Sequence, residues 1–576
     1  MTAIVDATGG GEAPWWQRAV IYHVYPRSFM DSNGDGVGDL PGITSRLGYL
    51  AELGADAVWL SPFYRSPMAD FGYDVSDHCD VDPLFGNLDD VDELIARAHD
   101  LGLRVVVDYV PNHTSDQHPW FVEARSSRDN PKRDWYVWSD PAPGGGLPTN
   151  WRSEFGGPAW TLHEATGQYY YHAYLAEQPN LNWHHPEVRR AMIDVLRFWL
   201  DRGVDGFRLD AFRRLFVDLT FPDEPENPHY RPEVHNESLA VLPVHTSEQP
   251  ELFDLASELR REIDALGDHL LIGEIYLDLE ALMRYHGTAD APGLHLAGNF
   301  NLLWTDWDAA AIADLLVTYE SVLPDHAWPN WVLGNHDRSR IASRVGPRQA
   351  RVAAMFLLTT RGTPTLYYGD ELGMTDVEIP PDAVRDPWEK NVPGMGFGRD
   401  PVRTPMPWTD GAHGGFSTVE PWLPLGPDST ERNVDAQRAD PTSIWTLHRR
   451  LLDLRRSISS LALGEISGVV ADQGVLGYRR RHEGRDLLVL LEMSGRPASV
   501  GLHAHASDLP EQEAAIVLST GLDREGPIGN SDATVELRAD EGLVIEWVWR
   551  ALPPIRYSHR SDGVWRNRQL RGATCR

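Results

Sequence analysis

Cysteine is nearly absent from this chain of 576 residues, which contains only Cys79 and Cys575. Two cysteines cannot build a disulfide framework, and they cannot supply a zinc site made of several thiolates. Positive charge is also scarce, because 52 lysines and arginines stand against 85 aspartates and glutamates, for a net charge of −33. Such a field repels phosphate backbones, so we expect no nucleic-acid partner, whereas a neutral ligand is unaffected.

Long apolar runs are missing as well. No stretch approaches the roughly 18 apolar residues that cross a bilayer, so we expect no membrane partner. Residues 1–16 show no apolar segment of the kind found in a signal peptide. These absences predict a cytoplasmic protein, and nothing in the sequence indicates its oligomeric state.

Strand-like and helix-like segments alternate between residues 19 and 372. The strand-like runs are rich in β-branched residues and end at Gly or Asp, which favours strands over buried helix segments. The helix-like segments carry one apolar face, as in residues 186–203. Eight such units in succession predict an α/β fold, a (β/α)8 TIM barrel. The eight strand-like runs are AVIYHVYP, ADAVWLSP, LRVVVDYVP, VDGFRLDA, HLLIGEIY, LHLAGNFNL, NWVLGNHD and TPTLYYGDE.

Two interruptions and a late change of pattern predict additional parts. About 70 residues rich in Trp, Tyr, Pro and Gly follow the third strand, which is too long for a simple loop. A second insertion, from about 216 to 250, follows the fourth strand. Later segments alternate with period two, as antiparallel strands do. We therefore expect a barrel at 1–111 and 183–461, an inserted subdomain at 112–182, a C-terminal antiparallel β-sandwich at 462–551, and a disordered basic tail at 552–576.

Three carboxylates stand at the ends of strand-like runs: Asp210 in GFRLDA, Glu274 in LLIGEIY and Asp337 in VLGNHD. The carboxyl ends of barrel strands meet at one face, so these groups are expected to gather there. Carboxylates held in contrasting environments can serve as the acid and the nucleophile of glycoside cleavage.

The surroundings of the first two carboxylates differ. Arg208 shares a strand face with Asp210, and a guanidinium beside a carboxylate favours the ionised form that a nucleophile needs. Glu274 follows an apolar run, where desolvation raises a carboxyl pKa and suits a general acid. The alternative is a set of structural ion pairs at the end of the barrel.

Four segments, DYVPNH, GFRLDA, GEIY and NHD, occur in this order and resemble the four signature regions of the α-amylase superfamily, glycoside hydrolase family 13. QPNLNW resembles the fifth region, with Asn180 where many members have Asp. The segments ADFGYD and GRDPVRTPMPW resemble the exo-acting branch of α-glucosidases and oligo-1,6-glucosidases. The resemblance covers residues 15–549 and implies a retaining α-glucosidase that releases terminal non-reducing glucose from short α-glucosides.

The resemblance also implies residue roles. Asp210 would be the nucleophile, Glu274 the general acid/base and Asp337 the stabiliser of the transition state. Ala211 stands where α-1,6-preferring members have Val, so α-1,4 bonds of the maltose type are expected. The substrate-binding residues implied are Asp70, Tyr73, His113, Phe155, Tyr174, Arg208, Ala211, His336, Arg399 and Arg403.

Several alternatives stay open. For the aromatic residues of this set, simple packing is the alternative, and the sequence does not decide which of Arg399 and Arg403 reaches the sugar. At the level of activity, α-glucosyl transfer at the same site and oligo-1,6-glucosidase activity remain open.

The segment DSNGDGVGD places oxygen donors at alternate positions: Asp31, Asn33, Asp35, the Val37 carbonyl and Asp39. This spacing resembles a calcium loop. An EF-hand is disfavoured because the twelfth position is a glycine rather than a bidentate glutamate. The family resemblance implies a structural Ca²⁺, in whose place Mg²⁺ could bind. An acidic turn without metal is the alternative.

Overall fold

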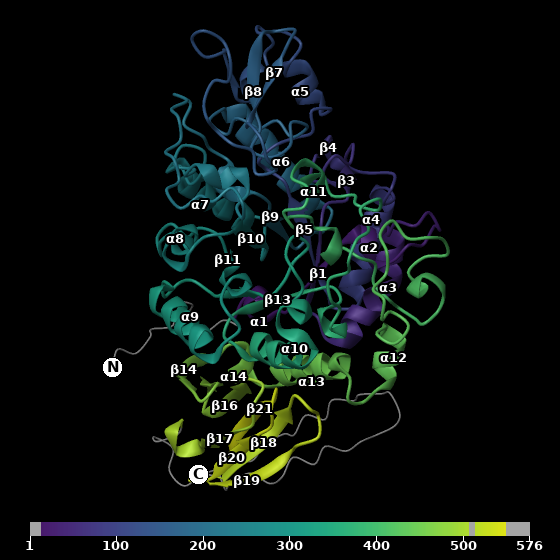
Figure 1. The fold of residues 1–576 in the computed structure, drawn as a ribbon, viewed down its shortest axis with the longest axis vertical. Helices are drawn as coiled ribbons and strands as arrows, with labels where there is room; N and C mark the ends of the chain where they lie inside the picture. Colours follow the sequence, from purple (N-terminus) through teal and green to yellow (C-terminus); the bar gives the residue numbers. More distant parts are fainter. Residues whose placement is uncertain (1–12, 506–512, 531, 549–576) are drawn as a thin grey trace.

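The centre of the molecule is a nearly closed barrel of eight parallel strands, in a computed structural model that describes residues 13–505, 513–530 and 532–548 (Figure 1). Around the ring the strand order is β11-β10-β9-β5-β2-β1-β13-β12. Each strand lies within one of the eight strand-like runs, so the predicted barrel is confirmed. The strands are β1 (Ile21–Val24), β2 (Ala57–Leu60), β5 (Arg104–Tyr109), β9 (Gly206–Leu209), β10 (Leu270–Ile275), β11 (Leu296–Asn299), β12 (Asn330–Val332) and β13 (Thr363–Tyr367).

Helices follow the barrel strands and cover their outer face. The apolar stripe of α6 is buried, as its three- and four-residue spacing predicts. The start of α4 is fixed by a capping box between Asn87 and Asp90. Among the helices of the described residues, none has both the length and the apolar character that a membrane span requires. The main helices are α3 (Leu40–Leu53), α4 (Leu88–Asp100), α6 (Pro186–Asp201), α7 (Glu251–Asp264), α8 (Leu279–Met283), α9 (Ala309–Val322), α10 (Ile341–Thr359) and α13 (Ile444–Ser457).

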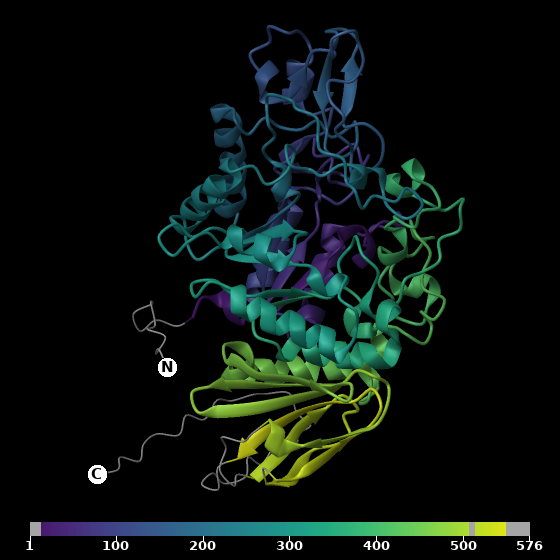
Figure 2. The same cartoon turned by 60° about the vertical axis from the view of Figure 1, so that its left-hand side comes forward.

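The insertion after the third barrel strand forms a small antiparallel sheet with the strand order β6-β8-β7. A short helix and this sheet lie at one end of the molecule, and the C-terminal strands lie at the other (Figures 1 and 2). A separate hairpin, β3 with β4, precedes α4. These elements are α5 (Pro119–Ala124), β6 (Trp138–Ser139), β7 (Trp160–His163), β8 (Gln168–Tyr171), β3 (Tyr64–Arg65) and β4 (Asp77–Val81).

The second insertion, residues 216–250, has little regular structure beyond a single 3-10 turn at Glu237–Ala240. One buried carboxylate organises it instead. Glu224 accepts hydrogen bonds from the backbone N–H groups of Val244, His245 and Thr246, at 2.9–3.0 Å. A segment without helical or strand periodicity can therefore still have a defined path.

The C-terminal part is antiparallel, as the alternating pattern predicts. A six-stranded sheet, ordered β14-β15-β16-β21-β18-β19, packs against the two-stranded sheet β17-β20 around a shared apolar core. Helices α10 and α13 lie between this domain and the barrel (Figure 2). The tail expected at 552–576 lies outside the described residues. The strands are β14 (Glu465–Asp472), β15 (Val475–His482), β16 (Arg485–Glu492), β17 (Ala498–Gly501), β18 (Glu513–Ser519), β19 (Gly526–Asn530), β20 (Thr534–Leu537) and β21 (Gly542–Val548).

Candidate active site

The register of two neighbouring strands brings Asp210 and Glu274 together. Leu209 of β9 pairs with Gly273 of β10, so the next residue of each strand follows at the same level. The guanidinium of Arg208 lies between the two carboxylates. Its Nη1 is 2.6 Å from Asp210 Oδ1 and its Nη2 is 2.6 Å from Glu274 Oε1. The two carboxylates are therefore held within the span of a single guanidinium.

The backbone turns sharply directly after Asp210. Ala211 has a left-handed conformation with φ of 47°, which a non-glycine residue rarely adopts. In this conformation its N–H donates to Glu274 Oε2 at 2.9 Å. Strain of this kind costs roughly 1–3 kcal/mol and persists only where the surrounding structure enforces it. The turn thus adds a second donor to Glu274.

Burial and neighbouring charges control the ionisation of Asp210. Burial raises the pKa of Asp210 well above its ordinary value, and the charge of Glu274 raises it further, while Arg208 acts in the opposite direction. Arg208 thus favours the ionised form of Asp210, as the sequence predicts, but burial and the Glu274 charge outweigh it. Two carboxylates on one cation interact directly, and such a pair in different surroundings suits one acid and one nucleophile.

Asp337 lies in a more positive environment. Its Oδ1 accepts from Arg403 Nη2 at 2.8 Å and lies 3.6 Å from Arg399 Nη1. Burial acts to raise the pKa of Asp337, but His336, Arg403 and Arg399 more than offset it, so the pKa lies below its usual range. An anion is therefore fixed beside the carboxylate pair, where it can stabilise positive charge on a reacting sugar.

A chain of contacts joins these two groups of carboxylates. Asp108 accepts from Arg208 Nη1 at 3.1 Å and from the Tyr73 hydroxyl at 2.9 Å. The same hydroxyl lies 2.8 Å from His336 Nε2, directly before Asp337 in sequence. Burial raises the pKa of Asp108 to about 7 although Arg208 opposes this. The structure thus places all three predicted catalytic acids around one connected polar site.

Arg399 links this site to Asp70. Its Nη2 is 2.7 Å from Asp70 Oδ1, while Arg403 reaches Asp337 instead. Asp70 Oδ2 is also 3.3 Å from Gln178 Nε2. The sequence prediction did not include Gln178 or Asp386, the other partner of Arg399. Gln178 could have been found, because it lies inside QPNLNW, whereas Asp386 belongs to no motif.

The predicted aromatic residues adjoin these charges. The ring of Phe155 lies 5.8 Å from that of Tyr174, and Arg399 Cζ is 5.0 Å from the centre of the Phe155 ring. Tyr174 in turn lies 5.5 Å from the His113 ring. Phe155 and Tyr174 therefore contact charged or polar groups of the site as well as each other.

His113 is held by the protein on both ring nitrogens. Nδ1 lies 3.1 Å from Asn112 Oδ1, and Nε2 lies 3.0 Å from Gln178 Nε2. Burial lowers the pKa of His113 to about 3, so the ring is neutral. Asn180, at the position where the resemblance departs, donates to the same Asn112 Oδ1 at 3.1 Å and accepts from the Ala173 N–H at 2.7 Å. The amide at position 180 is therefore part of the framework around His113.

Hydrogen bonds within the loop fix the conformation of the segment that is predicted to hold calcium. Asp31, Asn33 and Asp35 each accept from the N–H two residues further on, at 2.8–3.0 Å. Asp39 caps α3 by accepting from the Gly42 N–H at 2.7 Å. In the described part of the chain, no three His, Cys, Asp or Glu side chains are grouped to hold a metal ion. A cation here would depend also on the Asn33 amide and Val37 carbonyl, and this all-oxygen set has the chemistry that Ca²⁺ prefers.

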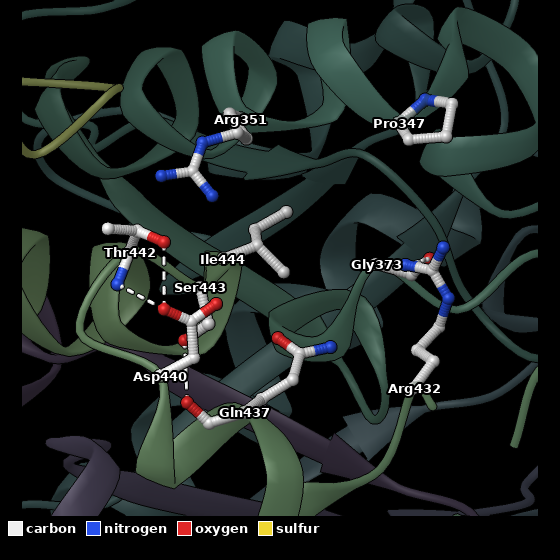
Figure 3. Close-up of a pocket in the computed structure, with 9 residues that line it drawn as sticks. All are labelled: Pro347, Arg351, Gly373, Arg432, Gln437, Asp440, Thr442, Ser443 and Ile444. Carbon is white, nitrogen blue, oxygen red and sulfur yellow. Dashed lines mark hydrogen bonds between the residues drawn. The ribbon is translucent and has the colours of Figure 1, made fainter. Parts of the chain in front are cut away.

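A cavity of about 280 Å³ lies apart from these residues, between α10, α12 (Val434–Ala439) and the start of α13 (Figure 3). Its arginines already have partners. Arg351 Nε donates to the Thr520 carbonyl at 2.9 Å, and Arg432 Nε donates to Asp428 at 2.6 Å. Its lining includes none of the predicted site residues, so the candidate site is the carboxylate cluster at the strand ends.

Comparison with known proteins indicates the same family as the sequence motifs. The profile of the α-amylase catalytic domain matches residues 23–464. The chain is 43% identical over 508 residues to a probable α-glucosidase of Rhizobium meliloti, covering 84% of this chain and 90% of that protein. It is 36% identical over 522 residues to an oligo-1,6-glucosidase of Parageobacillus thermoglucosidasius, covering 83% and 90%. Among solved structures, the α-glucosyl transfer enzyme XgtA matches with a TM-score of 0.86 at 39% identity, covering 93% of this chain and 100% of that one.

Proposed function

The chain belongs to the α-amylase family and is an α-glucosidase-type glycoside hydrolase, and on that premise we propose that it releases terminal α-glucose from short α-glucosides with retention of configuration. The observation that supports retention is the guanidinium shared by Asp210 and Glu274. Retaining enzymes hold their two carboxyl groups about 5–5.5 Å apart, closer than inverting enzymes, which leave room for a water. Two carboxylates on one guanidinium fit the closer arrangement.

The proposed reaction has two steps. The Glu274 carboxyl donates a proton to the glycosidic oxygen while Asp210 attacks the anomeric carbon and the aglycone leaves. Asp337 stabilises the positive charge that develops on the sugar. Glu274 then removes a proton from water, which attacks the anomeric carbon and releases Asp210 as a carboxylate. Ionised Asp210 and protonated Glu274 are the two forms that the first step requires.

The decisive experiment follows the first anomer of glucose by NMR during hydrolysis of maltose, isomaltose, sucrose, trehalose and an aryl α-glucoside. We expect α-glucose to form first and β-glucose to appear only by mutarotation. Initial formation of β-glucose would exclude the retaining mechanism. Absence of glucose release from every substrate would exclude the proposed function.

We also propose a preference for α-1,4 bonds, supported by Ala211 beside the nucleophile. Ala211→Val adds two methyl groups at a backbone position that disfavours β-branched residues. We expect the ratio of kcat/KM for maltose to kcat/KM for isomaltose to fall by about tenfold, a methyl-sized discrimination. Ala191→Val on the outer helix α6 serves as the control. An unchanged ratio would remove Ala211 as the source of the preference.

Glucosyl transfer is the second candidate, favoured by the similarity to an α-glucosyl transfer enzyme over the full length of that chain. In transfer, a sugar hydroxyl takes the place of water in the second step. Product analysis at low and high maltose concentration separates the two activities. Transfer predicts that trisaccharides rise with maltose concentration, and hydrolysis predicts glucose alone.

We propose that the loop at residues 31–39 binds a structural Ca²⁺, or Mg²⁺ in its place. Its supporting feature is the alternation of oxygen donors with glycines in left-handed conformation at Gly34 and Gly36. Chelation should lower the Tm, and added Ca²⁺ should restore it. Asp35→Ala, which removes an exposed carboxylate of the loop, should abolish the response to Ca²⁺. A Tm that chelator leaves unchanged in the native chain would contradict the proposal.

A further inference from the structure

Asp386 forms a buried ion pair with Arg399. Its side chain is fully buried, and both of its oxygens contact the guanidinium: Oδ1 is 2.7 Å from Nη2, and Oδ2 is 3.0 Å from Nε. Oδ2 also accepts from the backbone N–H of Arg399 at 2.6 Å. A bidentate contact fixes the plane of the guanidinium as well as its position.

The guanidinium of Arg399 also lies close to two further carboxylates, Asp70 and Asp337. Arg399 Nη2, which contacts Asp386, is also 2.7 Å from Asp70 Oδ1. Arg399 Nη1 lies 3.6 Å from Asp337 Oδ1. Asp386 and Asp70 therefore share one nitrogen of one cation, so the strength of one contact affects the other.

The same ion pair closes a loop of the chain. The segment 386–399 begins with α11 (Pro387–Asn391), whose first turn Asp386 caps through the Trp388 N–H at 3.3 Å. Trp388 lies 5.2 Å from the Phe155 ring, against which Arg399 also packs. The two ends of this segment are thus joined at Asp386 and Arg399, beside the predicted wall of the pocket.

We propose that Asp386 is a positioning residue for glucoside binding, which acts through Arg399 to keep Asp70 available to the sugar. Because Asp386 neutralises part of the positive charge of Arg399, Asp70 keeps oxygen lone pairs free to accept hydrogen bonds from sugar hydroxyls. Without the Asp386 charge, Arg399 would pair with Asp70 more strongly, and a sugar would have to displace it. The inference rests on the proposed α-glucosidase function.

The ionisation of Asp386 agrees with this role. Burial acts to raise the pKa of Asp386, but the charge and hydrogen bonds of Arg399 outweigh it, so the pKa lies below its ordinary value. The carboxylate is therefore charged throughout the range in which the enzyme would work. By contrast, burial raises the pKa of Asp70 although Arg399 opposes it. The geometry agrees, because Arg399 makes three side-chain hydrogen bonds to Asp386 and one to Asp70.

The test is Asp386→Asn, which keeps the shape of the side chain and removes its charge. We expect KM for maltose to rise by about tenfold, the change that one hydrogen bond to a charged group contributes. We expect kcat to stay within about twofold, because Asp386 contacts neither Asp210 nor Glu274. A fall in kcat at unchanged KM would overturn the proposal, and so would unchanged kinetics in a folded variant.

A double-mutant cycle separates this role from general stabilisation. In an Arg399→Gln background, Asp386→Asn should have no further effect on KM, since the intermediary is gone. An equal KM factor in both backgrounds would show that Asp386 does not act through Arg399. Asp428→Asn is the matched control, because it removes the 41% exposed carboxylate partner of Arg432, which lines the separate cavity and is not among the predicted site residues. Its KM should equal that of the native chain.

Two further measurements ensure that the inference about Asp386 can be tested. If Asp386→Asn does not fold, Arg399→Lys answers the same question, because lysine keeps the charge but cannot make the bidentate contact. A raised KM in that variant supports the proposal, and an unchanged KM overturns it. If the native chain releases no glucose from any α-glucoside, the proposed function fails. If the native chain is active and the Asp386→Asn variant has the KM of the native chain, only the inference about Asp386 is overturned.

Discussion

Arg208 is nearly fully buried, yet it contacts three carboxylates: Asp108, Asp210 and Glu274. A buried cation without such partners would be strongly destabilising, and buried carboxylates without the cation would stay protonated. The arrangement therefore fixes both the positions and the proton content of the group. The contacts of Arg208 therefore contribute both to the proposed reaction and to the stability of the fold.

Arg208→Lys tests the electrostatic part of that dependence. Lysine cannot contact two carboxylates in the fork geometry, so each carboxylate loses stabilisation of its charged form. Moving positive charge away from an acid raises its pKa, and both limbs of the pH profile of kcat/KM should therefore move to higher pH. The profile is measured with an aryl α-glucoside between pH 4 and 9. A shift toward lower pH would contradict the assignment of this group.

Asp210→Asn tests the nucleophile. The amide cannot form the covalent bond to the anomeric carbon, so kcat should fall by about 10⁴-fold or more, as for other lost nucleophiles. Binding of glucose, measured by calorimetry, should remain. Asp218→Asn, in the insertion beyond the same strand, provides a control that should keep full activity. Substantial turnover by Asp210→Asn would mean that another group attacks the sugar.

At the residue scale, a sequence motif marked each of the three carboxylates that the structure brings together. Asp210, Glu274 and Asp337 stand near the ends of strand-like runs, and the structure places all three around one polar site. Their proposed roles stay predictions. Asp386 could not be found from the sequence, because its partner Arg399 is 13 residues away in a segment without periodicity and their contact depends on the tertiary path.

At the scale of elements, strand existence followed from composition, but the paths beyond the strand ends did not. All eight barrel strands lie in the predicted runs, since buried parallel strands are almost continuously apolar. The run NWVLGNHD, however, contributes only Asn330–Val332 to its strand, and Asp337 lies in the following turn. Turns at strand ends are set by local hydrogen bonds, such as that from the Asp337 N–H to Asn335, which periodicity does not report.

The insertion at 216–250 gives a prediction at this scale. Glu224→Ala removes the acceptor of three backbone N–H groups and should destabilise the segment by roughly 1–3 kcal/mol. Limited proteolysis should then cut within 216–250 sooner than in the native chain. Glu226→Ala removes an exposed carboxylate of the same segment and should leave the cleavage rate unchanged. Equal cleavage of both variants would show that Glu224 does not organise the insertion.

At the scale of the whole molecule, buried neutral histidines predict a loss of stability in acid. Burial lowers the pKa of six histidines to about 3 or 4, so the unfolded chain binds protons below pH 6.5 that the native state does not. Stability decreases as the pH is lowered wherever the unfolded state binds more protons. Seven buried carboxyls with a raised pKa act in the opposite direction, but they are fewer than the nine buried histidines whose pKa is lowered. The six histidines are His78, His113, His172, His286, His295 and His448, and the pKa is also lowered at His23, His118 and His336. The carboxyls are Asp70, Asp74 (about 6), Asp108 (about 7), Asp210, Asp370 (about 7), Glu371 and Asp400.

Calorimetry between pH 7 and pH 4.5 measures this effect. We expect the Tm to decrease steadily over that interval. His448→Gln, in α13, removes one of the six groups and should make the decrease shallower, because glutamine does not titrate. A Tm that is constant or rises on acidification would contradict the prediction that the histidines outweigh the carboxyls.

The closure of the barrel has a consequence for synthesis. Strand β1 pairs with β2 on one side, but Ile21 finds its other neighbour only in Thr365 of β13. At roughly 5–20 residues per second, a ribosome needs on the order of 20–70 s to make the intervening chain. Throughout that time the first strand emerges with one open edge, so the nascent chain needs protection from pairing with its neighbours until translation is nearly two-thirds complete.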